Sequence, residues 1–203
     1  MGDPAKETKD KILRRMRPFT RDQMQLIRSK LKAQGAIRDL ALFNVGIDTM
    51  LRGGDLVRLR MRDIVDFKGE IIENFPVIQD KTEKPVHVQL TPKTRAAVAA
   101  LIKAQDKWSD DSLFTKARDN HGKHLSEVAL RQIVKGWAEI AEVDPEFYSG
   151  HSMRRSKAVI VYRETRDPEI VRQMLGHSSL AHTIAYLGVD KEDVAAVALR
   201  FDV

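Results

Sequence analysis

His151 and Arg154 have the types and the spacing that phosphate chemistry requires. Residues three apart share one face of a helix, so both side chains would project in the same direction. A guanidinium grips two phosphate oxygens through its planar fork, and an imidazole beside it donates or accepts a proton. A solvated basic helix start has the same pattern, and this motif alone favours that alternative.

A second segment combines His177 with Tyr186, which follows it by nine residues. Tyr186 lies off the apolar stripe of the helix expected there, which consists of Leu180, Ile184 and Leu187. It is therefore either an ordinary surface residue or a nucleophile, because phenolate attack on phosphorus needs an exposed hydroxyl near positive charge. The other tyrosines fit this role less well: Tyr162 ends an apolar run, and Tyr148 is in a predicted loop.

Arg52 is the third candidate. It stands where a strongly apolar helical segment runs into Gly53 and Gly54. Asp55, three residues later, would serve it as the partner of a structural ion pair. The alternative is that Arg52 is a phosphate ligand held rigidly by the core behind it.

Together these residues resemble the tyrosine recombinase family, also called phage integrases. The matching motifs occur in the family's order and approximate spacing: Leu51-Arg52-Gly53-Gly54-Asp55, Asp80-Lys81-Thr82, His151-Ser-Met-Arg154, Leu175-Gly176-His177-Ser178-Ser179, and Tyr186. The likeness runs from about residue 18 to 190. Arg155 departs from it, standing where the family often has histidine, and so do Lys157 and Val159.

The resemblance implies a site-specific DNA recombinase that breaks and rejoins strands through a 3′-phosphotyrosine intermediate. It implies no metal, no ATP and no other cofactor. The site residues that it implies are Arg52, Lys81, His151, Arg154, His177 and Tyr186. In that scheme Tyr186 is the nucleophile and His151 helps accept its proton. Lys81 protonates the leaving oxygen, while the two arginines and His177 bind the scissile phosphate.

The implied partner is double-stranded DNA, bound by a protein that is monomeric in solution and forms a tetramer-like homo-oligomer on DNA. Candidate phosphate contacts, each also explicable as ordinary surface charge, are Arg58, Arg60, Arg62, Lys84, Arg155 and Lys157. Two alternatives share the same residues. One is a type IB topoisomerase-like enzyme, and the other is a DNA-binding accessory or regulatory protein with vestigial catalytic residues.

The composition excludes several other classes. The 203 residues include 35 Lys and Arg against 29 Asp and Glu, a net charge of +6 that favours a polyanionic partner. Absence of cysteine excludes disulfide scaffolds, Cys-based zinc sites and thiol catalysis. His121 and His124 have no third ligand nearby, so no metal site is predicted. No apolar run reaches the ~18 residues of a membrane span, and we expect a cytoplasmic protein of a bacterium or of a phage-infected host.

The elements that must position these residues are mainly helical, with a small three-stranded antiparallel sheet. Helices are predicted at 20–35, 40–51, 55–59, 92–105, 125–142, from 150 onward, 168–176, 178–187 and 190–200. Strands are predicted at 64–67, 70–72 and 86–90, with turns at Lys68-Gly69 and at 80–84. Residues 1–16 are expected to be a basic linker or tail. Residues 17–203 are expected to form the catalytic domain, without the amino-terminal core-binding domain usual in the family.

Overall fold

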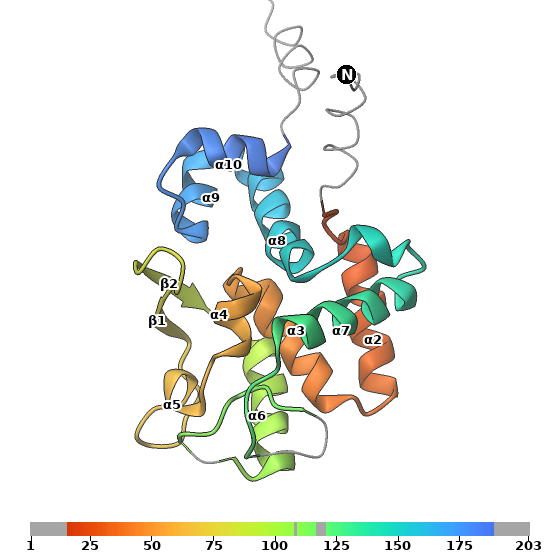
Figure 1. Cartoon of the computed structure of the whole chain (residues 1–203), viewed down its shortest axis with the longest axis vertical. Helices are drawn as coiled ribbons and strands as arrows, with labels where there is room; N and C mark the ends of the chain where they lie inside the picture. The colour runs from red at the N-terminus through yellow and green to blue at the C-terminus, as the bar shows by residue number, and fades with distance from the viewer. Residues whose placement is uncertain (1–15, 108, 117–120, 189–203) are drawn as a thin grey trace, which may run out of the picture.

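The computed structural model describes residues 16–107, 109–116 and 121–188. Most of this chain is helical (Figure 1). The helices are α2 (Arg21–Ala33), α3 (Ile37–Thr49), α4 (Gly53–Val57), α5 (Met61–Ile64), α6 (Pro92–Gln105), α7 (Glu127–Ile140), α8 (Gly150–Thr165), α9 (Pro168–Leu175) and α10 (Leu180–Leu187), with a short 3-10 helix, η1, at Pro145–Phe147. The predicted tail, apart from residue 16, and the predicted helix at 190–200 lie outside the described residues.

The predicted helix boundaries are confirmed where the sequence carries capping residues. The Thr20 hydroxyl accepts the Gln23 backbone N–H at 3.2 Å, and Gln23 Oε1 accepts the Thr20 N–H at 2.9 Å, so the capping box is complete. Thr91 caps α6 through its side chain in the same way. Asp167 caps α9, which ends at Gly176 in the left-handed conformation.

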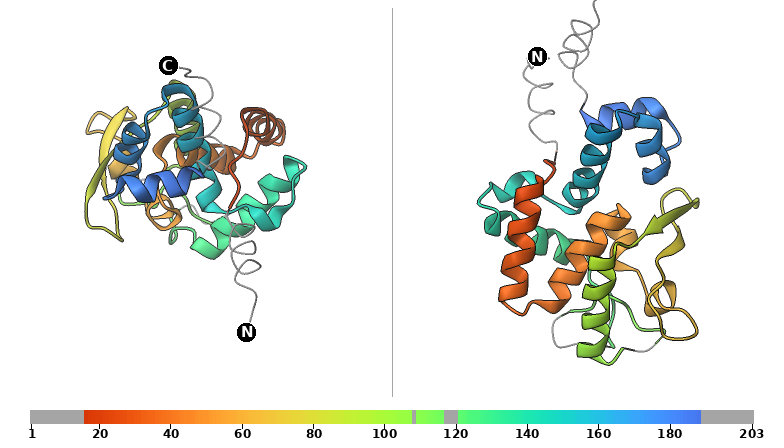
Figure 2. Two further views of the ribbon diagram at one scale, coloured as in Figure 1. Left: turned by 90° about the horizontal axis from the view of Figure 1, so that it is seen from above. Right: turned by 180° about the vertical axis from the view of Figure 1, so that it is seen from behind.

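Helix α3 is the centre of the fold, and residues 41–49 are all buried. It packs against α2, α6 and α8, and the view from behind shows α2, α3 and α6 side by side (Figure 2). The Phe43 ring meets the Trp137 ring of α7 edge-to-face, with centroids 5.1 Å apart. Because α3 is held on most sides, the residues that follow it, including Arg52, start from a rigid base.

A second, smaller apolar cluster joins α8, α9 and α10, which form the upper part of the molecule in Figure 1. Its buried members are Met50, Ala158, Val171, Leu175 and Leu187. The cluster therefore fixes the three helices whose ends carry His151, Arg154, His177 and Tyr186.

The prediction of three strands was wrong. The described residues form one sheet of two antiparallel strands, β1 (Asn74–Ile78) and β2 (Pro85–Gln89), in which Phe75 pairs with Val88. The strand predicted at 86–90 is confirmed as β2, and the polar turn before it is confirmed as the link from β1. The strands predicted at 64–67 and 70–72 are not present, because residue 64 ends α5 and only one bridge, between Val65 and Ile71, remains.

Two local effects explain this difference. The Asp66 carboxylate accepts the backbone N–H groups of Lys68 and Glu70, at 2.8 and 2.9 Å, and so competes with a strand ladder. Strand β1 was missed because Pro76 has no N–H and is a poor strand residue. Proline is tolerated there since, in the part of the chain that the structure describes, β1 pairs with β2 alone.

Gly176 provides a test of how α9 meets the hairpin. Its φ is +64°, and a Cβ atom there would lie 2.5 Å from Val86 Cγ2. We therefore expect Gly176→Ala to lower the free energy of unfolding by at least about 1–2 kcal/mol, since strain and overlap add. Urea denaturation followed by circular dichroism measures this.

Gly136 is the matched control, because it is helical and a Cβ there meets no atom within 4 Å. Gly136→Ala is expected to raise the free energy of unfolding by up to about 1 kcal/mol. Equal stability of wild type and Gly176→Ala would contradict the close contact between α9 and β2.

Candidate active site

Segments that are far apart in the sequence converge on one place. They are the start of α4, the turn between β1 and β2, the start of α8, the end of α9, and α10 (Figure 1). Contacts between side chains and backbone connect five of the six predicted residues: Arg52, His151, Arg154, His177 and Tyr186. Lys81 lies on the exposed turn, and its charge is one of those that lower the pKa of His151.

Arg154 is the most deeply buried of these residues, with 3% of its surface exposed. Its Nη1 donates to the Met50 carbonyl and its Nη2 to the Leu175 carbonyl, the latter at 2.6 Å. Burial lowers the pKa of Arg154 to about 10; the Arg52 charge acts in the same direction and Tyr186 opposes it. The guanidinium therefore remains charged at neutral pH, held by the ends of α3 and α9.

Arg52 is the N-cap of α4, and its Nη1 donates to Gln79 Oε1. The alternative of an Arg52–Asp55 ion pair is not what the structure contains. The Asp55 carboxylate instead accepts the Asp80 backbone N–H at 3.0 Å, which ties the turn between the strands to α4. Arg52 thus has a neutral hydrogen-bond partner, and its positive charge lowers the pKa of both His151 and His177.

Gln79 is a functional-site residue that the sequence analysis missed. It is fully buried at the end of β1, and its Nε2 lies 3.4 Å from the Leu175 carbonyl that also holds Arg154. Residues 75, 77 and 79 lie on the same face of the extended chain, because every second residue of a strand points the same way. This two-residue spacing was the signal that could have placed Gln79 on the inward face. Because β1 was not predicted, that signal was not read.

The surroundings of both histidines of the site favour the neutral imidazole. His151 is the second residue of α8, and its pKa is lowered by desolvation and then by the charges of Arg154 and Arg52. The pKa of His177 is lowered to about 4, first by burial and then by the same two arginines. The His177 Nδ1 lies 3.1 Å from the hydroxyl of Thr183, which is completely buried.

Tyr186 is half-buried, whereas the nucleophile alternative had expected an exposed hydroxyl. Its ring packs against the second apolar cluster and meets the His177 ring edge-to-face at 5.6 Å. Its hydroxyl donates to the His151 carbonyl at 3.4 Å. Burial raises the pKa of Tyr186 to about 12, although Arg154 and Arg155 oppose the shift. Tyr148, by contrast, is buried against Phe19 in the main core.

The predicted DNA contacts divide into two groups. Arg58, Arg60, Arg62 and Lys84 are exposed; Arg58 pairs with Asp80 at 2.8 Å and Arg62 with Asp110 at 2.6 Å. Arg155 and Lys157 are instead half-buried and bond to backbone carbonyls. Lys157 Nζ donates to Asp48 at 2.6 Å, so it joins α8 to α3 and does not lie open to solvent as expected.

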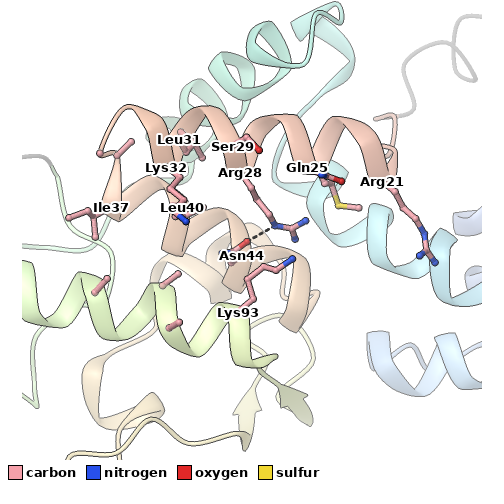
Figure 3. Close-up of a pocket in the computed structure, with 16 residues that line it drawn as sticks. Arg21, Gln25, Arg28, Ser29, Leu31, Lys32, Ile37, Leu40, Asn44 and Lys93 are labelled. Carbon is pink, nitrogen blue, oxygen red and sulfur yellow. Dashed lines mark hydrogen bonds between the residues drawn. The ribbon is translucent and has the colours of Figure 1, made fainter.

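A groove of about 850 Å³ lies elsewhere, between α2, α3 and α6. Its walls are largely apolar, with Arg28 bonded to Asn44 at 2.7 Å inside it (Figure 3). None of the six candidate residues lines this groove. Within the described ranges no three His, Cys, Asp or Glu side chains gather as metal ligands. Nor is any helix there long and apolar enough to cross a membrane.

Comparison with known proteins agrees with this geometry. The model of the phage integrase family matches residues 17–193, which include all six candidate residues. The chain belongs to the phage integrase family.

Two relatives of this family member show how much of the sequence is shared. Tyrosine recombinase XerC of Neisseria gonorrhoeae is 30% identical over 161 residues, which are 79% of this chain and 50% of that protein. Putative integrase/recombinase y4gC of Sinorhizobium fredii is 29% identical over 184 residues, 88% of this chain and 92% of that protein. The chain thus spans about half the length of the XerC relative.

Solved structures share the fold of this integrase family chain. XerA recombinase superposes with a TM-score of 0.72 at 19% identity, covering 92% of this chain and 65% of that one. XerH site-specific recombinase, bound to a palindromic difH substrate, gives a TM-score of 0.71 at 19% identity, covering 90% and 52%. The likeness confirms the mainly helical tyrosine recombinase catalytic-domain fold.

Proposed function

We propose that this protein is a site-specific DNA recombinase that breaks and rejoins strands through a phosphotyrosine at Tyr186. The observation that carries the proposal is the clustering of Tyr186 with two histidines and two arginines. Its hydroxyl bonds to the His151 carbonyl, its ring meets His177, and Arg154 and Arg52 are linked through the Leu175 carbonyl and Gln79. The names of its relatives, tyrosine recombinase and integrase/recombinase, support it. The structure of XerH with its difH substrate supports double-stranded DNA as the partner.

The phosphate is bound by fixed positive charge. As the Tyr186 oxygen approaches phosphorus, negative charge grows on the two non-bridging oxygens. Arg52 and Arg154 stabilise that charge, because their guanidinium groups are held in place before the reaction and need no reorganisation. His177 adds a hydrogen bond from its neutral ring. In this account the charge of Arg154 acts strongly because the residue is shielded from water.

Proton transfers complete the step. Tyr186 loses its proton to His151, and its oxygen forms a bond to phosphorus while the bond to the 5′ oxygen breaks. Lys81 gives a proton to that 5′ oxygen, which leaves as a hydroxyl. The phosphodiester energy stays in the phosphotyrosine, so a 5′ hydroxyl of another strand reverses the step without ATP. We propose that the protein acts as a homo-oligomer on DNA and that the exposed Arg58, Arg60, Arg62 and Lys84 contact its phosphates.

Strand transfer tests this proposal. The protein is incubated with nicked duplexes of a library sequence that lose a short 5′-hydroxyl strand after cleavage, in the presence of a chelator and without ATP. A second strand with a free 5′ hydroxyl is then added, and joined products are expected. Resealing of the original strand alone would indicate topoisomerase-like activity. Release of free ends without a protein-linked strand would contradict the proposal and indicate a nuclease.

The pH dependence of cleavage reports on His151. The pKa of this residue is lowered from 6.5, so the neutral form that accepts a proton persists below that pH. We expect the second-order rate of adduct formation to fall only as the pH drops through the lowered value, because protonated His151 cannot act as a base. His151→Asn is expected to lose about 100-fold in rate and this acid limb. His87→Gln, at an exposed position of β2, is the control; an unchanged limb in His151→Asn would contradict the assignment.

Thr183 decides which ring nitrogen of His177 carries the proton. The Thr183 hydroxyl lies 3.1 Å from His177 Nδ1 and 3.4 Å from the Ser179 carbonyl, and its single proton goes to one of the two. In this proposal it donates to the nearer Nδ1, which leaves the one N–H of the neutral imidazole on Nε2 for a phosphate. We expect Thr183→Val to slow single-turnover cleavage about 10-fold or more and Thr183→Ser to restore it. Nitrogen NMR of labelled histidine measures the tautomer directly. A wild-type rate in Thr183→Val would contradict this role.

A further inference from the structure

Gln79 has more hydrogen bonds to the site than its place in a hairpin requires. It is fully buried, and its Oε1 accepts from Arg52 Nη1 and from the Thr82 hydroxyl, the latter at 3.2 Å. Its Nε2 donates to the Leu175 carbonyl. Every polar atom of this side chain therefore has a partner, and the partners belong to three separate segments.

The backbone of Gln79 also closes the turn that carries Lys81. Its N–H donates to the Lys84 carbonyl at 3.1 Å, while its own carbonyl accepts from Thr82 at 3.3 Å and from Glu83 at 2.8 Å. Lys81 is exposed in the middle of this turn. The placement of Lys81 thus depends on Gln79 from both sides.

The amide side chain also bridges the two arginines. Arg52 bonds to Oε1, and the Leu175 carbonyl next to Nε2 accepts Arg154 Nη2 at 2.6 Å. A buried amide with both ends occupied does not rotate without breaking two bonds, so a change in the orientation of Arg52 is transmitted to the turn.

We propose that Gln79 is a positioning residue that couples the arginines to the turn carrying Lys81. The roles of those residues rest on the proposed function. The Arg52 guanidinium holds Oε1 of Gln79 with one nitrogen and binds the phosphate with the others. Gln79 then holds Thr82 and the turn, so the Lys81 ammonium is presented to the leaving oxygen of that same phosphate. These bonds are present without a phosphate, so the turn that carries the proton donor is already placed when DNA binds.

A sulfur leaving group separates this role from phosphate binding. In a 5′-bridging phosphorothiolate the leaving group is a thiolate, and thiols have a pKa of about 8.5 against about 15.7 for water. The phosphorus–sulfur bond therefore breaks without a proton from Lys81. Gln79→Met is expected to slow cleavage about 10- to 100-fold on the oxygen substrate and about 3-fold or less on the sulfur substrate.

Three further variants are compared with Gln79→Met on the oxygen and sulfur substrates. Lys81→Met is expected to show the same relief by sulfur. Arg52→Met is expected to show only partial relief, because it loses a phosphate ligand as well as the link to the turn. Gln89→Met changes an exposed glutamine of the same hairpin and is expected to behave as wild type on both substrates. Equal defects of Gln79→Met on the two substrates, or no defect on either, would overturn the coupling.

Amide hydrogen exchange tests the coupling without catalysis. Removing the Arg52 side chain takes away one partner of Gln79, so we expect Arg52→Met to speed exchange at Thr82 and Glu83 in the free protein. Gln89→Met is expected to leave those amides unchanged. Unchanged exchange in Arg52→Met would overturn the proposal even if Gln79→Met did not fold. If wild type formed no DNA adduct on either substrate, the proposed function would fail while the exchange result still decided the coupling.

Discussion

Tyr186→Phe is expected to abolish formation of the protein–DNA adduct while leaving DNA affinity within about threefold of wild type. The ring carries the packing: it lies against the second apolar cluster and meets His177 edge-to-face. The hydroxyl donates one long hydrogen bond, to the His151 carbonyl at 3.4 Å, and it also interacts with the Arg154 guanidinium. Its loss is therefore expected to lower the free energy of unfolding by no more than about 3 kcal/mol.

Denaturing gels with labelled nicked duplexes measure the adduct, and mobility shifts at low salt measure affinity. Tyr162→Phe is the matched control, because Tyr162 also borders the second apolar cluster and is half-buried. Any denaturant-resistant adduct in Tyr186→Phe would show that another residue attacks the phosphate. Loss of DNA binding together with the adduct would mean that Tyr186 has a structural role.

The second large effect is expected from Arg154→Lys, which keeps the positive charge but not the planar fork. Cleavage under single-turnover conditions is expected to fall about 100- to 1000-fold, because a donor fixed toward the developing charge is lost. The Met50 and Leu175 carbonyls, which Arg154 now holds, would lose at least one bond. A buried carbonyl left unpaired costs about 1–3 kcal/mol, so a lower free energy of unfolding is expected as well.

Arg155→Lys is the control for Arg154→Lys, since it makes the same change at the next position of α8. Arg155 bonds the Met16 and Leu187 carbonyls at the edge of the site and is half-buried. The single-turnover cleavage rate of Arg155→Lys is expected to stay within about tenfold of the wild-type rate. If Arg155→Lys slowed cleavage as much as Arg154→Lys, the assignment of Arg154 as the arginine of the motif would be contradicted.

The helices of this fold were predictable because their ends carry explicit signals. Thr20, Thr91 and Asp167 each cap a helix as expected, and Gly176 ends α9 with a positive φ. The spacing of His151 and Arg154 correctly placed both on the first turns of one helix. Capping contacts join residues that are only two to four positions apart, so they can be recognised from the sequence alone.

The rest depends on contacts across the chain. Strand β1 was not predicted because it contains Pro76, and the inward orientation of the Gln79 side chain was therefore not predicted either. Two hydrogen-bond partners of this side chain, Arg52 and Leu175, are 27 and 96 residues away in the sequence. Lys157 was expected to be a surface lysine, yet its amine donates to the backbone carbonyl of Asp48, 109 residues away. Leu113 and Phe114 lie in a polar stretch but are fully buried in the main core. No local sequence pattern distinguishes these residues from residues that are exposed on the surface.

Identification of the residue that becomes linked to DNA tests whether Tyr186 is the nucleophile. Wild-type protein is trapped on nicked duplexes, digested, and the nucleotide-bearing peptide is sequenced by mass spectrometry. The chain has three tyrosines, Tyr148, Tyr162 and Tyr186, so the answer is unambiguous. The account predicts a 3′-phosphoryl linkage on Tyr186 alone. A linkage on another residue, or to the 5′ end of the cleaved strand, would contradict it.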